Sequence, residues 1–187
     1  MHTGMEAKES ATPDQTLLVL LAQSGDRGAL EELLREAYGP LRRYVTYLAG
    51  AGLADDILQE TSLQIFRKLQ HLREPAVFRA WTFRIASRIA FAQMKSARRW
   101  QSIEDAPVEE LTTFDERLGE PPDEAFLQMV ERVSPASRAV LLLRYQQDLS
   151  LEEAAAILEI PVGTAKSRLH YGVTMLRKYL TDERKPA

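Results

Sequence analysis

The sequence predicts an all-α protein of two small helical domains joined by an acidic linker. Apolar residues recur at steps of three and four along most of the chain, which is the spacing of one helix face. No run of alternating β-branched residues indicates a strand. From residue 102 to residue 122, prolines and a glycine interrupt an acidic stretch that lacks apolar periodicity. Such a stretch is typical of a linker, so we expect separate helical domains before and after it.

Composition narrows the class of protein. The chain has 187 residues, of which 45% are hydrophobic and 27% charged, as in a globular protein. It has no cysteine, which excludes disulfides and thiolate zinc sites and fits a cytoplasmic protein. No apolar run approaches the roughly 18 residues that a membrane span needs, and no signal peptide is expected. We expect no membrane insertion and no cofactor.

Charge is segregated along the chain although the net charge is only −3. Residues 73–99 contain seven basic residues and one acid, whereas residues 102–124 contain nine acids and one arginine. This separation predicts one part that faces a polyanion and another that faces a polycation. The basic residues of the first segment are Arg73, Arg79, Arg84, Arg88, Lys95, Arg98 and Arg99.

Local signals divide the chain further. We expect a flexible tail over 1–13, a first domain over 14–100, the linker over 101–122, a second domain over 123–182 and a tail over 183–187. In the first domain we expect a helix capped by Asp14, a second over 30–48 that is kinked or broken at Pro40, and two more over about 54–69 and 77–99, with a loop over 71–75. In the second domain we expect helices over 123–133, 134–146, 150–158 and 163–180.

The last two helices predict a helix-turn-helix. Ser150 and Glu153 form a capping-box pattern that marks a helix start, and three alanines at 154–156 favour close packing of a second helix. Residues 160–163, Ile-Pro-Val-Gly, break the chain before it becomes helical again. On the second helix, one face is apolar: Ala165, Leu169, Gly172, Val173, Leu176 and Leu180.

The opposite face of that helix is basic and hydrogen-bonding. Between residues 163 and 180 there are four cations and no acid, which suits a helix that lies in the major groove of DNA. A solvated helix with a basic end, favoured by its own dipole, is the alternative. The residues of this face are Lys166, Ser167, His170, Tyr171, Thr174, Arg177 and Lys178.

Three motifs then resemble one known family. Residues 163–170, GTAKSRLH, look like the promoter-reading helix of the extracytoplasmic-function (group 4) sigma factors of bacterial RNA polymerase. Residues 55–66, DDILQETSLQIF, are similar to that family's polymerase-binding helix, and residues 78–90, FRAWTFRIASRIA, resemble the helix that follows its promoter-melting loop. The motifs occur in the family's order and cover most of residues 30–180. The resemblance implies a factor that directs core RNA polymerase to promoter DNA and is held inactive by an anti-sigma factor.

The resemblance also assigns candidate site residues. For polymerase binding these are Asp55, Asp56, Gln59, Glu60 and Leu63. For the minus-ten DNA they are His71, Arg73, Phe78, Arg79, Arg84, Arg88, Lys95, Arg98 and Arg99. For the minus-thirty-five DNA they are Thr164, Lys166, Ser167, Arg168, His170 and Tyr171. A solvated helix start would explain Asp55 and Asp56 but not Leu63. Phe78 either stacks on a flipped base or belongs to the core.

Some positions depart from the family's pattern, and two other functions compete. Glu159 stands where glycine is common, Arg88 where asparagine is frequent, and Tyr171 and Val173 where arginines are frequent. A stand-alone helix-turn-helix regulator would account for residues 150–180 but not for residues 55–90. An enzyme with Asp55, Asp56 and Glu60 as metal ligands lacks an accompanying base, nucleophile or phosphate loop.

Overall fold

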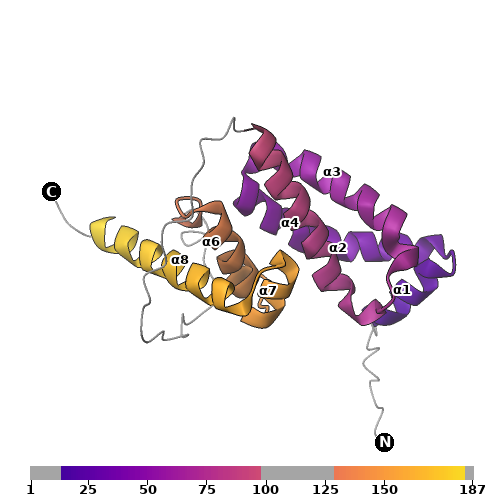
Figure 1. The fold of residues 1–187 in the computed structure, drawn as a ribbon. Helices are drawn as coiled ribbons and strands as arrows, with labels where there is room; N and C mark the ends of the chain where they lie inside the picture. The colour runs from indigo at the N-terminus through magenta and orange to yellow at the C-terminus, as the bar shows by residue number, and fades with distance from the viewer. Residues whose placement is uncertain (1–13, 98–128, 184–187) are drawn as a thin grey trace, which may run out of the picture.

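A computed structural model of the chain describes residues 14–97 and 129–183, and all regular elements in these ranges are helical. The first range forms α1, α2, α3 and α4, and the second forms α6, a π-helical turn η3, α7 and α8 (Figure 1). The predicted linker, the first tail, residues 184–187 of the second tail and the candidates Arg98 and Arg99 lie outside the described residues. No helix among the described residues is long and apolar enough to cross a membrane.

The first four α-helices form a bundle whose bounds follow local signals. Asp14 caps α1 by accepting from the Thr16 N–H at 3.2 Å, as predicted, and Asp26 caps α2 by accepting from the Ala29 N–H at 3.1 Å. Gly50 has φ 89°, a conformation open to glycine, and there the chain turns from α2 into α3. The bounds are Gln15–Gln23 for α1, Arg27–Ala49 for α2, Ala51–Lys68 for α3 and Phe78–Ala97 for α4.

Helix α2 runs through Pro40, where the sequence predicts a kink or a break. The helix does not break there, although proline cannot donate the usual backbone hydrogen bond. Buried residues on both sides of the proline, among them Leu33 and Leu48, hold the helix against the core. Tertiary packing therefore outweighs the local cost of the proline.

The core of the bundle centres on Tyr44. Its ring meets the Phe83 ring edge-on at 5.3 Å between centroids, and its hydroxyl lies 2.8 Å from the Ser87 hydroxyl. Burial raises the pKa of Tyr44 far above its ordinary value. The loop between α3 and α4 contains two short 3₁₀ turns, η1 (Leu69–His71) and η2 (Pro75–Val77), and the Gln23 amide of α1 ties this loop down by donating to the Leu69 and Leu72 carbonyls.

The second half is built on α6 (Pro135–Leu141), η3 (Leu142–Gln146), α7 (Leu151–Leu158) and α8 (Val162–Glu183). The single helix predicted over 134–146 is thus an α-helix that continues as a π-helical turn. Of the helix predicted over 123–133, the described part is helical only at residues 129–130. Helix α8 extends to Glu183, beyond its predicted end, because no breaking residue follows Leu180 within the helix.

Helices α7 and α8 pack closely, as their small residues predict. The capping box of Ser150 and Glu153 is present at the start of α7. Ala165, Leu169, Val173 and Leu176 of α8 are buried. Gly172 is also buried, and a Cβ there would come within 2.7 Å of Leu141 Cδ1. The close approach of α8 to α6 therefore requires glycine at this position.

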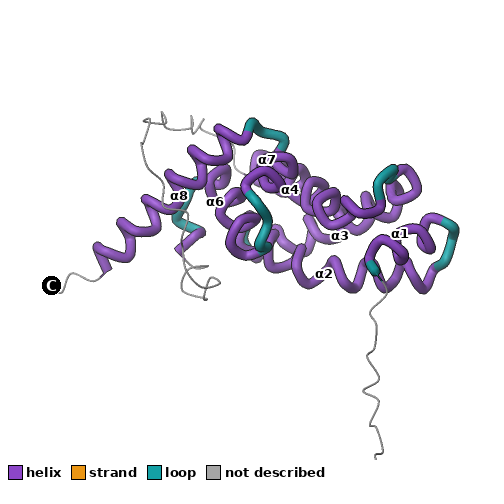
Figure 2. The backbone as a smooth tube through the Cα atoms, turned by 90° about the horizontal axis from the view of Figure 1, so that it is seen from below, coloured by secondary structure: helices purple, strands orange, loops and turns teal. Residues whose placement is uncertain are grey.

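The two halves lie side by side. Helix α7 packs against α4, and α6 and η3 pack against α2 (Figure 2). The division into a first and a second domain stays a prediction, because the described parts share this interface.

Candidate functional site

One face of α3 presents the residues predicted to bind polymerase. Leu58, Ile65 and Leu69 point inward and are buried, as predicted. On the opposite side Asp56 and Gln59 are exposed, and Leu63 keeps 42% of its surface exposed. The face continues into a shallow groove between α3 and α4, which is lined by Asp56, Gln59, Glu60, Leu63, Ile89, Ala92 and Gln93.

This groove combines carboxylates with apolar side chains. Glu60 is partly buried, and its Oε1 accepts a hydrogen bond from Gln64 Nε2 at 2.8 Å. Ile89 contributes a partly buried aliphatic side chain from α4. Asp55 is exposed next to Asp56 but does not line the groove. A partner surface with cations around an apolar pocket would complement it.

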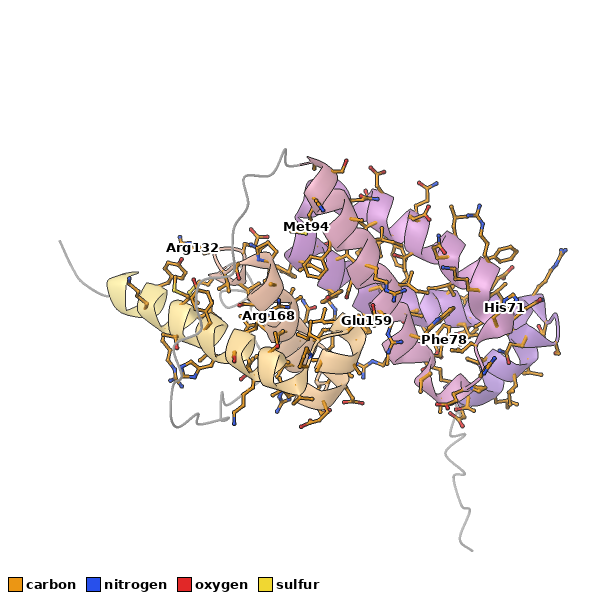
Figure 3. All side chains as sticks on the ribbon, in the orientation of Figure 1. His71, Phe78, Met94, Arg132, Glu159 and Arg168 are labelled. Carbon is orange, nitrogen blue, oxygen red and sulfur yellow. The ribbon has the colours of Figure 1, made fainter. Side chains whose placement is uncertain are left out.

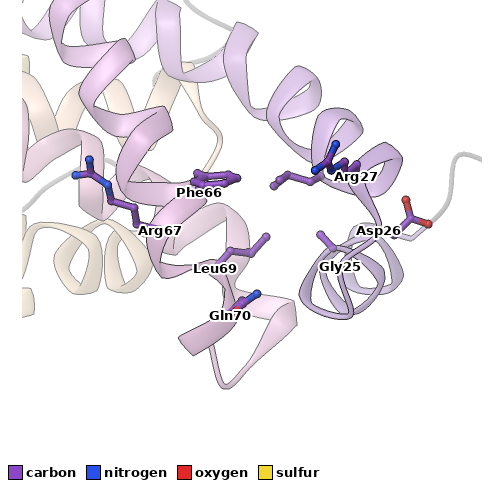
Figure 4. Close-up of a pocket in the computed structure, with 9 residues that line it drawn as sticks. Gly25, Asp26, Arg27, Phe66, Arg67, Leu69 and Gln70 are labelled. Atoms are coloured by element: carbon purple, nitrogen blue, oxygen red, sulfur yellow. The ribbon is translucent and has the colours of Figure 1, made fainter.

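A second hollow, of about 380 Å³, lies at the opposite end of α3. Phe66 borders it and is 62% exposed, the largest exposed fraction of any large hydrophobic side chain in the described part of the chain. Figure 4 shows Phe66 of α3 and Arg27 of α2 on opposite sides of this hollow. Sequence reasoning missed Phe66, although its place three residues after Leu63 on the same helix is a usable signal.

Helix α4 carries the basic residues predicted to contact DNA. Arg79 Nη2 donates to the Gln147 carbonyl at 2.5 Å, and its guanidinium lies 5.9 Å from the centre of the Phe83 ring. Arg88 donates from Nε and Nη2 to the two carboxylate oxygens of Glu159, at 2.8 and 2.6 Å. Lys95 is exposed, and Arg84 is half-buried. Two of the predicted phosphate ligands therefore bind the second half of the chain in this structure.

The loop before α4 exposes His71 and Arg73, as a DNA-facing loop requires. Phe78, by contrast, is completely buried, with its ring tilted against that of Trp81 at 6.1 Å between centroids. Figure 3 marks Phe78 in the first half of the chain. The sequence left open whether Phe78 stacks on a flipped base or belongs to the core. The structure places it in the core, because α4 begins at this residue and turns its first side chain inward. Phe78 therefore presents no face on which a base could stack.

Helix α8 presents the predicted DNA-reading residues. Lys166 and Tyr171 are exposed, whereas Arg168 and His170 are half-buried (Figure 3 shows Arg168). The Ser167 hydroxyl donates to the Gly163 carbonyl at 3.0 Å. Thr164, the remaining candidate, is half-buried in the first turn. The first two turns of α8 thus offer hydrogen-bonding and cationic groups from one helix.

Comparison with known proteins decides the family. Residues 30–100 match "Sigma-70 region 2", and residues 123–176 match "Sigma-70, region 4". The chain is 30% identical over 167 residues to the ECF RNA polymerase sigma factor SigC of Mycobacterium tuberculosis, which covers 88% of this chain and 90% of SigC. The chain belongs to the ECF sigma factor family.

Other relatives agree with this assignment. The sigma factor is 30% identical over 142 residues to the ECF RNA polymerase sigma factor SigW of Bacillus subtilis, covering 69% of this chain and 76% of SigW. Its fold resembles that of the sigma factor RpoE in a co-crystal structure with the anti-sigma factor NepR from Bartonella quintana. That likeness has a TM-score of 0.63 at 24% identity and covers 82% of this chain and 98% of RpoE.

The predicted surfaces fall within the matched regions of the sigma factor. The α3 groove and the basic helix α4 belong to region 2, and the first turns of α8 belong to region 4. The metal-site interpretation of Asp55, Asp56 and Glu60 is not supported. Within residues 14–97 and 129–183, no group of three or more histidines, aspartates and glutamates is placed to hold a metal ion.

Proposed function

We propose that this sigma factor docks on core RNA polymerase through the α3 groove and directs it to promoter DNA through α4 and α8. The observation that carries the proposal is the presence of two opposite kinds of surface in one chain. The α3 groove is acidic and apolar, whereas α4 and the first turns of α8 are basic. Together they suit a protein that joins a protein partner to a nucleic acid.

We propose that polymerase binds the α3 groove because the groove has an exposed apolar side chain with carboxylates beside it. Leu63 is an exposed aliphatic side chain next to the carboxylates of Asp56 and Glu60. Burial of such a side chain in a partner's apolar pocket contributes affinity, while the carboxylates select a basic partner surface. The groove lies on the surface of α3 and α4, where a partner can approach it.

Promoter binding is proposed for α8 and α4 together. Exposed Lys166 and Tyr171 lie where a recognition helix approaches base edges, and cations along α4 are suited to the phosphates. Since Phe78 is buried, capture of a flipped base would have to rely on other groups of the loop, such as His71.

We also propose a regulatory anti-sigma partner. The related RpoE structure was obtained in complex with the anti-sigma factor NepR. The exposed apolar side chains Leu63 and Phe66 are candidates for such a contact, because a regulator that covered them would exclude polymerase from the same helix. This function would place the protein in the cytoplasm, together with polymerase and promoters.

A pull-down with core RNA polymerase tests the proposal. We expect the wild type to be retained by polymerase and the double variant Asp56→Lys with Glu60→Lys to be lost, because two cations would face a basic partner surface. The matched control is Glu31→Lys with Glu131→Lys, which makes the same change of charge at two exposed positions outside the groove. A wild type that ignores polymerase but shifts duplex DNA alone would favour the stand-alone regulator.

A further inference from the structure

Helix α7 is tied at both ends to the basic helix α4. Before α7 begins, the Gln147 carbonyl accepts a hydrogen bond from Arg79, and where α7 ends, the Glu159 carboxylate accepts two from Arg88. Figure 3 shows Glu159 at the boundary between the two halves of the molecule. These contacts join residues that are 68 and 71 positions apart.

Glu159 occupies a backbone conformation that a glutamate rarely adopts. Its φ of 56° and ψ of 43° lie in the left-handed region, where glycine is favoured because it has no Cβ. The turn after α7 would therefore form with less strain if residue 159 were glycine. What the glutamate adds is its carboxylate, and both carboxylate oxygens are bound by Arg88.

A carboxylate and a DNA phosphate compete for the same donors of an arginine. Both accept two parallel N–H hydrogen bonds from one guanidinium. Arg88 therefore has its paired donors on Glu159 and cannot offer them to a phosphate at the same time. Arg79 donates from Nη2 alone to one backbone carbonyl, that of Gln147.

We propose that Arg88 and Glu159 form a latch that closes the second half of the chain over the basic face of α4. In the closed form, Glu159 takes the place of a DNA phosphate, and the free protein binds DNA weakly. Opening the latch releases Arg88 for DNA. It also frees α7 and α8 to move to the promoter DNA that α8 is proposed to read. The DNA part of this inference rests on the proposed function of α4.

The polymerase-binding groove remains uncovered in the closed form. Its lining residues come from α3 and from the later part of α4, and none of them is a latch residue. Polymerase could therefore dock on the closed protein, whereas DNA could not fully engage α4. The latch therefore restricts the DNA contacts of α4 without closing the polymerase-binding groove.

The latch is weak enough to open. The side chains of Arg88 and Glu159 are 64% and 45% exposed, and ion pairs with this much water contact contribute little. Other contacts also hold the halves together, such as the Gln147 amide on the Pro40 carbonyl at 3.4 Å. Removing the pair should shift the balance between closed and open forms by about two- to fivefold.

The lack of native cysteine allows a direct measurement of opening. Spin labels on Ala51→Cys and Ala156→Cys, both exposed, report the distance between α3 and α7 in the full chain. We expect Glu159→Gln to shift the distance distribution to longer values. The control Glu152→Gln removes the same charge from an exposed position of α7 and should leave the distribution unchanged.

Binding of a short fluorescent DNA duplex to the free protein gives a second readout. We expect Glu159→Gln to bind about two- to fivefold more tightly than Glu152→Gln at equal salt, since both variants have the same net charge. Glu159→Gly should open the protein in the same way without lowering its unfolding temperature, because glycine suits the turn. Unchanged distances in both Glu159 variants, or equal DNA affinity of the two glutamine variants, would overturn the latch. Neither readout uses polymerase, so a failed pull-down would leave the latch intact.

Discussion

Arg138 in α6 donates a hydrogen bond from Nη1 to the backbone carbonyl of Leu48 near the end of α2, at 2.9 Å. Its Nη2 donates to the carbonyls of Val133, at 2.9 Å, and Glu131. The Arg138 residue is only 8% exposed. One buried guanidinium therefore joins the two halves of the sigma factor and orders the turn that precedes α6.

Replacing Arg138 should destabilise the whole chain. Arg138→Met keeps much of the side-chain volume but leaves three carbonyls without this donor, so we expect a loss of about 2–4 kcal/mol in the free energy of unfolding. Urea denaturation followed by circular dichroism measures it. Arg35→Met, at an exposed position of α2, should change the free energy by less than about 0.5 kcal/mol. Equal stability of the two variants would contradict this role of Arg138.

Two glycines of α8 should respond differently to the same substitution. Gly172→Ala places a Cβ within 2.7 Å of Leu141 Cδ1, and the overpacking should cost about 1–3 kcal/mol. Gly163→Ala meets no heavy atom within 4 Å, so it should be neutral or slightly stabilising, since alanine favours a helix. Thermal unfolding of both variants provides the comparison. A neutral Gly172→Ala would show that α6 and α8 pack less closely than described.

Glu153 should make stability depend on pH. Its carboxylate accepts from the Ser150 backbone N–H at 2.7 Å, and this hydrogen bond lowers the pKa of Glu153 below its ordinary value. A lowered pKa stabilises the folded state above the unfolded pKa, and this stabilisation is lost as pH falls through the folded value. Between about pH 6 and about pH 3, the wild type should therefore lose more stability than Glu153→Gln. Parallel pH profiles for the two proteins would refute this.

Lys166 provides a functional test of α8. If α8 reads the promoter, Lys166→Ala should weaken binding of the polymerase–sigma complex to DNA by about 1–3 kcal/mol and leave polymerase binding unchanged. The DNA would be selected by the wild-type complex from a random library, and affinity measured by fluorescence anisotropy. Lys68→Ala, at an exposed position of α3 outside the candidate surfaces, is the control. Equal losses in the two variants would argue for a nonspecific effect of charge.

The sequence predicted the helices well where their signals are local. Caps at Asp14 and Ser150 and the inward faces of α3 and α8 are confirmed, because each depends on residues within a few positions. Of the kink or break predicted at Pro40, the break does not occur, since packing of α2 on both sides of the proline outweighs the missing hydrogen bond. The π-helical turn of η3 has no comparable signal in the sequence.

By itself, the sequence determined the all-α class, the placement of most helices and the sigma-factor resemblance. These features depend on helical spacing and short motifs, which involve only neighbouring residues. Only the tertiary structure decided that Phe78 is buried and that Arg88 binds Glu159. The sequence marked Arg88 and Glu159 as two separate departures from a pattern. Their pairing depends on how α7 packs against α4, and that packing is set by both halves of the chain together.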